Sequence, residues 1–196
     1  MIVNPKLVAQ LRAETGAGIV ECKNALDEAG GDQKKATEIL RKKGEIKAAK
    51  KSAERTTKEG LVHAYVHANG KVGAMIEMSC ETDFVARNEE FQALVHDIAM
   101  QVAATNPLYV KPEDVPGEVV AKEKEMYLEE IRGQEKPPAL VEKILEGKLE
   151  KYFEDVCLLK QPFVKDEDIT IEELINQKIA KIGEKIEIKK FVRFQI

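Results

Sequence analysis

The chain has 196 residues, of which 43% are hydrophobic and 34% are charged, and its formal net charge is −4. This length predicts one or two domains, and the composition is typical of a folded chain rather than a fibrous or wholly disordered one. The longest uninterrupted apolar run, Val156–Leu159, is far shorter than the ~20 residues of a membrane-spanning helix. The first residues show no export signal, so we expect a cytoplasmic protein without membrane association.

Charge is distributed unevenly along the chain. Residues 1–60 carry 13 basic and 9 acidic side chains, which leaves 18 and 26 for residues 61–196. The acidic overall balance argues against nucleic acid as a direct partner, because nucleic-acid binding needs a basic surface. The contrast between the two parts predicts separate modules. We divide the chain into a helical domain over residues 1–45, a basic helical linker over 46–59 and an α+β core over 60–196.

Three short helices are predicted within the first domain. Pro5 is favoured at the first position of a helix, and the glycine-containing run Thr15–Gly18 ends this helix. A second helix is expected over residues 19–29. Asp32 caps a third, which Gly44 is expected to stop. The result is a compact three-helix docking module that is similar in plan to ubiquitin-associated domains.

The basic segment over residues 41–58 contains eight basic and two acidic residues and no aromatic residue. We interpret it as a solvated helical linker. The alternative is a strip that contacts phosphates, which would make the protein an RNA-binding or ribosome-associated accessory factor. Proteins that bind single-stranded RNA usually add aromatic side chains on which bases stack, and this segment has none.

The core begins with a predicted β-hairpin. Residues 61–67 and 72–78 are rich in β-forming residues, and Asn69 and Gly70 between them are a strong turn signal. A third strand is expected near the C-terminus, with one apolar face at period two. That face comprises Ile186, Ile188, Val192, Phe194 and Ile196.

Helical patterns fill the region between the hairpin and the last strand. Residues 88–106 repeat apolar side chains at helical spacing, so this helix is expected to cover the sheet. Further helices are expected over residues 118–131, from 138 to about 159 with a break at Gly147, and over 170–183. The predicted fold class is therefore α+β, with an N-terminal three-helix domain and an antiparallel-sheet core covered by helices.

Motifs for catalysis or metal binding are weak in this sequence. It has no glycine-rich phosphate loop and no CxxC pair. His63 and His67 lie on the same face of a strand near Cys80, but they lack the further ligands that structural zinc needs. A hydrolase centred on Cys80 or Asp83 stays a formal alternative. We predict no enzyme activity, no resident metal and no cofactor.

The stretch over residues 80–88 is unusual because it places Asp83 beside Phe84 between a predicted strand and a predicted helix. Two interpretations are open. Either Phe84 is exposed and anchors a partner's pocket, or it turns inward as part of the core and Asp83 is a turn residue.

Two long motifs resemble those of a known family. Residues 11–26, LRAETGAGIVECKNAL, resemble the N-terminal signature of translation elongation factor Ts, and residues 77–88, EMSCETDFVARN, resemble its second signature. Shorter matches lie at residues 46–51, 161–164 and 191–194. The likeness extends from Leu7 to Phe194, and the two long motifs are highly specific.

The resemblance implies a guanine nucleotide exchange factor for elongation factor Tu, the GTPase that carries aminoacyl-tRNA to the ribosome. It implies that a loop enters the GTPase near its magnesium ion, with Phe84 as a wedge and Asp83 helping to shift the switch region. This loop comprises Thr82, Asp83, Phe84 and Val85. It also implies that the helical domain docks on the GTPase and that His67 makes a further contact from the core. The docking residues are Leu11, Arg12, Ile19, Val20 and Lys23.

Longer members of the family carry two related core halves, whereas this chain has one. That single core would bear both His67 and the Thr82–Val85 loop, at places too distant for one copy to serve both contacts. We therefore predict a homodimer in which each core serves as the other's missing half.

Overall fold

The structure is a computed structural model that describes residues 4–131 and 137–196, with the backbone alone for residues 45–54. The chain divides into two units. Unit 1 comprises residues 1–61, 78–94 and 173–187, and unit 2 comprises residues 62–77, 95–172 and 188–196. The predicted fold class is confirmed, because helices combine with an antiparallel sheet.

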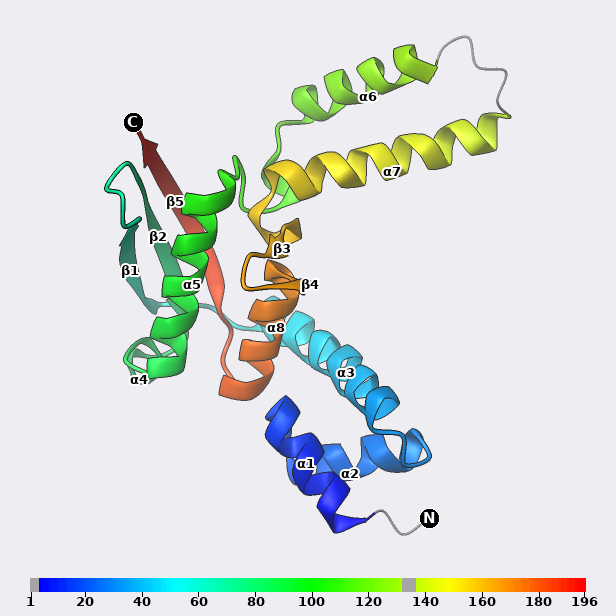
Figure 1. Cartoon of the computed structure of the whole chain (residues 1–196), viewed down its shortest axis with the longest axis vertical. Coiled ribbons are helices and arrows are strands. Elements are labelled where there is room, and N and C mark those ends of the chain that lie inside the picture. Colours follow the sequence, from blue (N-terminus) through cyan, green and yellow to red (C-terminus); the bar gives the residue numbers. More distant parts are fainter. Residues whose placement is uncertain (1–3, 132–136) are drawn as a thin grey trace. The chain divides into compact units, whose positions relative to one another are not determined.

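Unit 1 begins with the three expected helices, α1 (Pro5–Thr15), α2 (Ile19–Glu28) and α3 (Gln33–Glu54), which pack against one another (Figure 1). The Asn4 side chain caps α1 by accepting a hydrogen bond from the Lys6 N–H at 3.0 Å. The helices enclose a small core of fully buried side chains. This core comprises Leu11, Cys22, Ala25, Leu26 and Ala36.

Helix α3 continues through Gly44 to Glu54, so the prediction that Gly44 ends this helix was wrong. A single interior glycine costs a helix only about 1 kcal/mol relative to alanine. The following residues, EIKAAKKSAE, are mostly good helix formers and outweigh that cost. Most of the basic segment over residues 41–58 therefore has a helical backbone, while its side chains at residues 45–54 lie outside the described part.

The expected hairpin and third strand form one sheet in the order β1 (Glu59–Val66), β2 (Val72–Cys80) and β5 (Glu187–Gln195). The β1–β2 turn is closed by a hydrogen bond from the His67 N–H to the Val72 carbonyl at 2.8 Å. Strand β5 runs antiparallel to β2, since the Ile196 N–H donates to the Lys71 carbonyl at 3.0 Å and the Ser79 hydroxyl donates to the Glu187 carbonyl at 3.4 Å.

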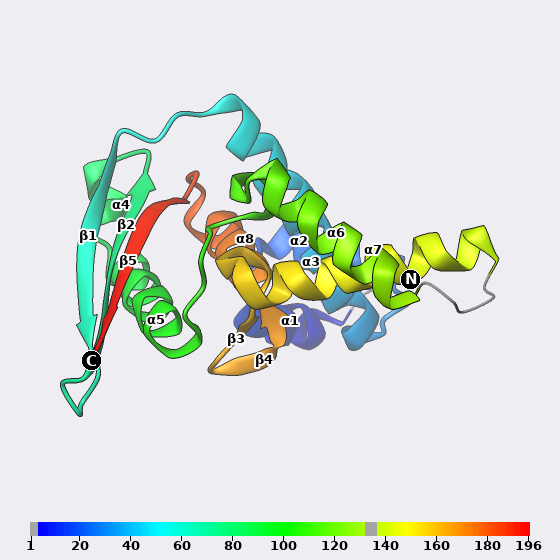
Figure 2. The same ribbon diagram turned by 90° about the horizontal axis from the view of Figure 1, so that it is seen from above.

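Helix α5 (Glu89–Thr105) covers one face of this sheet, as predicted (Figures 1 and 2). The Arg193 Nε donates to the Ala103 carbonyl at 2.9 Å, and the His63 ring contacts His96. Buried side chains repeat at helical spacing along α5 and at every second residue along β2. They include Phe91, Leu94, Val95, Ile98 and Val102 from α5 and Ala74, Ile76 and Met78 from β2.

The apolar stripe predicted along the last strand is only half correct. Ile186 and Ile188 are buried, but Val192, Phe194 and Ile196 are 43%, 67% and 98% exposed. Buried and exposed residues do not alternate regularly along β5, because the neighbouring Lys189 and Lys190 are both exposed. Beyond them Arg193 faces α5, and the large apolar residues face the other side of the sheet.

Unit 2 also contains a helical hairpin of α6 (Gly117–Ile131) and α7 (Pro138–Val156), which lie side by side (Figure 1). The Lys148 ammonium pairs with Glu130 and lies 5.1 Å from the centre of the Tyr127 ring. Helix α7 passes through Gly147 without a break, contrary to the prediction. A 3₁₀ turn, η1 (Pro112–Asp114), precedes α6.

After α7 the chain forms a second 3₁₀ turn, η2 (Leu158–Lys160), and a two-stranded hairpin of β3 (Pro162–Phe163) and β4 (Asp166–Thr170) that the sequence did not predict. The fully buried Gln101 of α5 holds this segment. Its amide donates to the Pro162 carbonyl at 3.0 Å, and its side-chain oxygen accepts from the Val164 N–H at 2.9 Å. Helix α8 (Ile171–Ile182) then leads into β5.

Across residues 4–131 and 137–196, no helix is long and apolar enough to span a membrane.

Candidate partner-binding site

The Thr82–Val85 motif adopts one turn of helix, α4 (Asp83–Ala86), where the sequence predicted a loop. Thr82 is the N-cap, and its hydroxyl oxygen accepts a hydrogen bond from the Val85 N–H at 3.4 Å. The Asp83 carboxylate pairs with the Arg87 guanidinium at 3.0 Å, one turn further along. A cap and an i,i+4 ion pair both favour helix, so the motif has a defined shape.

Phe84 projects from this turn and is 79% exposed. The structure thus excludes the interpretation in which Phe84 turns inward as part of the core. Asp83 and Val85 on either side are half-buried. An exposed aromatic ring on an ordered turn presents apolar surface that a partner's pocket can enclose.

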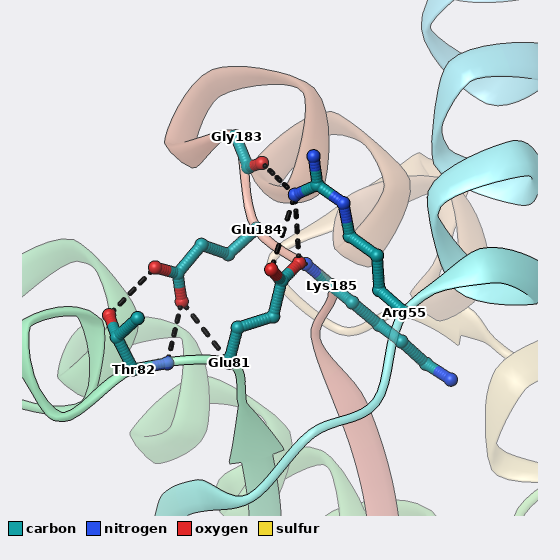
Figure 3. Close-up of polar contacts among 6 residues, drawn as sticks. All are labelled: Arg55, Glu81, Thr82, Gly183, Glu184 and Lys185. Carbon is teal, nitrogen blue, oxygen red and sulfur yellow. Dashed lines mark hydrogen bonds and ion pairs between the residues drawn. The ribbon is translucent and has the colours of Figure 1, made fainter.

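The Glu184 carboxylate accepts three hydrogen bonds from the two residues that precede α4, Glu81 and Thr82 (Figure 3). One carboxylate oxygen accepts from the N–H groups of Glu81 and Thr82, both at 3.1 Å, and the other accepts from the Thr82 hydroxyl at 2.7 Å. Charge-assisted hydrogen bonds of this kind are stronger than neutral ones. The first residues of the motif are therefore fixed by the segment that follows α8.

Glu81 completes a second set of contacts in the same place. Its carboxylate accepts from the Lys185 N–H at 2.6 Å and from the Arg55 guanidinium at 3.1 Å (Figure 3). The same Arg55 group donates to the Gly183 carbonyl at 3.3 Å. Three segments distant in sequence thus meet at this point, which is the end of the linker after α3, the end of β2 and the loop after α8.

Sequence reasoning singled out neither Arg55 nor Glu184. Local motifs do not indicate such contacts, since Glu184 lies about a hundred residues from Thr82. The one available signal was Gly183, which has a φ of +91° at the end of α8. Glycine in this conformation ends a helix and turns the chain sharply, so it marked a reversal but not its target.

The predicted docking residues of the helical domain divide into two groups. Ile19 and Val20, in the first turn of α2, are 57% and 69% exposed, and Arg12 and Lys23 are exposed as well. This exposed group combines apolar side chains with cations. Leu11, by contrast, is fully buried in the core of the three helices, so the structure assigns it a packing position rather than a surface one.

His67 is exposed at the turn between β1 and β2, where its Nδ1 lies 3.1 Å from the Tyr65 hydroxyl. His63 belongs to the same cluster of rings, because its Nε2 lies 3.1 Å from His96 Nδ1 on α5 and the centre of the His96 ring lies 5.6 Å from that of Tyr65. Burial and the neighbouring His96 charge lower the pKa of His63. Among the side chains that the structure describes, which lie in residues 4–44, 55–131 and 137–196, no group of three or more histidine, cysteine or acidic residues is placed to hold a metal ion.

The surroundings of Cys80 argue against a nucleophilic role. The residue is buried, and burial together with the nearby Glu184 carboxylate raises the pKa of its thiol to about 11. Its Sγ lies 3.2 Å from the Thr82 carbonyl. Since the thiolate is the reactive form, Cys80 is a packing residue at neutral pH rather than the centre of a hydrolase.

Comparison with known proteins identifies the family. The family model for elongation factor TS matches residues 7–196. Over its whole length the chain is 54% identical to elongation factor Ts of Thermodesulfovibrio yellowstonii and 56% identical to that of Thermotoga petrophila, and it covers 97% of each. It is 54% identical to elongation factor Ts of Fervidobacterium nodosum and covers 99% of that protein. The chain belongs to the elongation factor Ts family.

Proposed function

We propose that this protein is a guanine nucleotide exchange factor for elongation factor Tu. It binds the GDP-bound GTPase, disturbs the magnesium and phosphate site and promotes release of GDP so that GTP can bind. The observation that carries this proposal is the 79% exposure of Phe84 on a helical turn that is capped by Thr82 and held by Glu184. Exchange of this kind forms no covalent bond and needs no cofactor, so the protein is not an enzyme in the bond-making sense.

In this mechanism Phe84 acts as a wedge, and Asp83 helps to displace the switch region. Mg²⁺ requires near-ideal octahedral coordination, so small shifts of its ligands weaken its binding sharply. Weakening GDP binding a thousandfold requires about 4 kcal/mol of coupling free energy. Burying one aromatic ring supplies at most about 3–5 kcal/mol, and part of that is offset by ordering at the interface. Other contacts must therefore contribute.

We assign those contacts to the other exposed residues implied by the family motifs. The domain over residues 1–45 docks on the GTPase through Arg12, Ile19, Val20 and Lys23, while Leu11 maintains its core. Residues 46–59 act as a linker, which is helical as far as Glu54. The domain over residues 60–196 supplies the Thr82–Val85 turn and His67.

A homodimer is the second part of the proposal. The face of the sheet turned away from α5 carries large apolar side chains, among them Val66 at 68% and Phe194 at 67% exposure. We call this set, which also contains Val62, Met75 and Val192, the open sheet face. Apolar surface of this kind is typical of interaction sites, and a second copy of the same face matches it in chemistry and permits a closed two-fold dimer.

The basic segment over residues 41–58 does not favour RNA as the partner. Three of its described side chains already pair with carboxylates of the protein. Arg41 lies 3.6 Å from Glu173, Lys43 lies 2.6 Å from Glu28 and Arg55 lies 3.1 Å from Glu81. These pairs reduce the positive charge available to phosphates, which supports the linker interpretation.

The test is stopped-flow release of a fluorescent GDP from elongation factor Tu. We expect the wild-type chain to accelerate release and Phe84→Ala to lose most of the acceleration. Leu108→Ala is the control, because Leu108 is also exposed, at 62%, but lies outside the motif. Absence of acceleration by the wild type would refute the exchange function, and full activity of Phe84→Ala would refute the wedge.

A further inference from the structure

The entry to α4 depends on a side chain from a distant part of the chain. A helix of four residues has no stability of its own in water, so the orientation of Phe84 must be set by contacts outside α4. The contacts that a distant segment makes at its first residues are three hydrogen bonds to one carboxylate, that of Glu184. Two of these come from successive backbone N–H groups, which fixes the direction of the chain as it leaves β2.

The third hydrogen bond fixes the capping hydroxyl. A threonine hydroxyl has one proton to donate and two lone pairs that accept. The Thr82 hydroxyl donates to Glu184 at 2.7 Å and accepts from the Val85 N–H at 3.4 Å. With its proton committed to Glu184, the oxygen turns its lone pairs toward the helix. Glu184 therefore orients the cap as well as the backbone that precedes it.

Glu184 is itself held firmly. Gly183 ends α8 with a left-handed backbone, its N–H donates to the Ile179 carbonyl at 2.9 Å, and its carbonyl accepts from Arg55 at 3.3 Å. The Lys185 N–H donates to the Glu81 carboxylate at 2.6 Å. The contact is thus reciprocal, because each of the two segments provides a carboxylate that accepts from the backbone of the other (Figure 3).

We propose that Glu184 is a positioning residue for nucleotide exchange, which holds the Thr82–Val85 turn in the orientation that carries Phe84 into the GTPase. This inference rests on the exchange function proposed above. Glu184 touches neither nucleotide nor magnesium in this role. It acts on the step that follows docking, so its loss lowers the rate of GDP release within the complex more than it weakens the complex.

The test measures GDP release from elongation factor Tu over a range of factor concentrations, for Glu184→Ala, Glu184→Gln and the wild type. For Glu184→Ala we expect the saturating rate to fall about tenfold or more, because small misplacements of a positioned group are costly. The half-saturating concentration should stay within roughly threefold of the wild type, since the docking surface is intact. Glu184→Gln should regain part of the rate, because its amide oxygen still accepts from both backbone N–H groups, whereas its NH2 group cannot accept the proton of the Thr82 hydroxyl.

Hydrogen exchange gives a readout that is independent of the GTPase. Amides of residues 82–87 should exchange faster in Glu184→Ala than in the wild type, with little change in the amides of α5. Asp97→Ala is the matched control, since it also removes one partly exposed carboxylate, here together with its 2.7 Å ion pair with Lys165. It should leave both the exchange rate and the motif amides unchanged.

Three results would overturn the inference. These are a wild-type saturating rate in Glu184→Ala, a Glu184→Gln variant as slow as the alanine variant, and unchanged exchange of the motif amides. If circular dichroism shows that Glu184→Ala unfolds at the assay temperature, Glu184→Asp replaces it, because this variant keeps the charge and withdraws the carboxylate by one methylene. If the wild type itself does not accelerate GDP release, while hydrogen exchange of the motif amides still depends on Glu184, the exchange function is refuted. The role of Glu184 in holding the Thr82–Val85 turn would then still be supported.

Discussion

Phe84 and Phe91 lie seven residues apart and occupy opposite environments, since Phe84 is 79% exposed and Phe91 is fully buried. The first lies on α4 and the second in the first turns of α5. The same side chain therefore provides a matched comparison between a surface residue and a core residue within one short segment.

Alanine substitutions at these two positions should differ sharply in their effect on folding. Phe91→Ala should lower the free energy of unfolding by about 3–5 kcal/mol, because it removes a buried ring and leaves a cavity. Phe84→Ala should change it by less than about 0.5 kcal/mol. Urea denaturation followed by circular dichroism measures both. A large loss of stability in Phe84→Ala would mean that the ring packs inward in solution.

Dimerisation should depend on the open sheet face. In the proposed dimer, Phe194→Glu would bring a charge into the apolar contact between two open sheet faces, and we therefore expect this variant to be monomeric in light scattering at micromolar concentration. The matched control is Leu108→Glu, which places the same charge on another exposed apolar residue. A monomeric wild type, or a Phe194→Glu variant that stays dimeric, would contradict this assignment.

Alanine substitutions at two glycines, Gly60 and Gly147, should have opposite effects on stability. A Cβ at Gly60, where φ is +150°, would lie 2.2 Å from the Met78 carbonyl oxygen on the neighbouring strand, so Gly60→Ala should destabilise the protein by about 2 kcal/mol or more. Nothing lies within 4 Å of a Cβ at Gly147 inside α7. Gly147→Ala should stabilise by about 0.5–1 kcal/mol, since alanine is the better helix former. Thermal unfolding of the two variants distinguishes these signs.

Stability should also depend on pH through His63. Its pKa in the folded protein is lowered, first by burial and then by the charge of His96, so the unfolded chain binds the proton more readily. The contribution of this group is complete above the unfolded pKa of about 6.5 and is lost as the pH falls below it. Denaturation at pH 7.5 and pH 5.5 should show a smaller decline for His63→Gln than for the wild type. An equal decline would place the pH dependence elsewhere.

Elements set by local pattern could be predicted from the sequence. The helix that ends at Thr105 follows from its apolar spacing, and the β1–β2 hairpin follows from the turn at Asn69 and Gly70. Gly44 and Gly147 were misjudged for one reason. Both were read as stops, but glycine only weakens a helix by a small amount, and the packing of neighbouring turns decides whether it continues.

For the candidate site, the sequence indicated which residues form it but not their conformation. The motif pointed to Thr82–Val85, but its helical conformation, the exposure of Phe84 and the grip of Glu184 depend on contacts between segments far apart in the chain. Leu11 shows a second limit of the motif match. The match does not distinguish a surface residue from a core residue that supports it, and Leu11 is buried in the core.

The single helical turn of α4 also sets a limit on how its chemistry can be borrowed. A peptide that copies residues 80–88 would carry the aromatic ring and the acid but would lack Glu184, which supplies three of the hydrogen bonds at its start. Such a peptide would sample many conformations in water, and the entropy lost when it is ordered on binding would weaken its affinity strongly. Inhibitors that imitate this element should therefore be cyclised or otherwise constrained from outside the copied sequence, as the folded chain itself does.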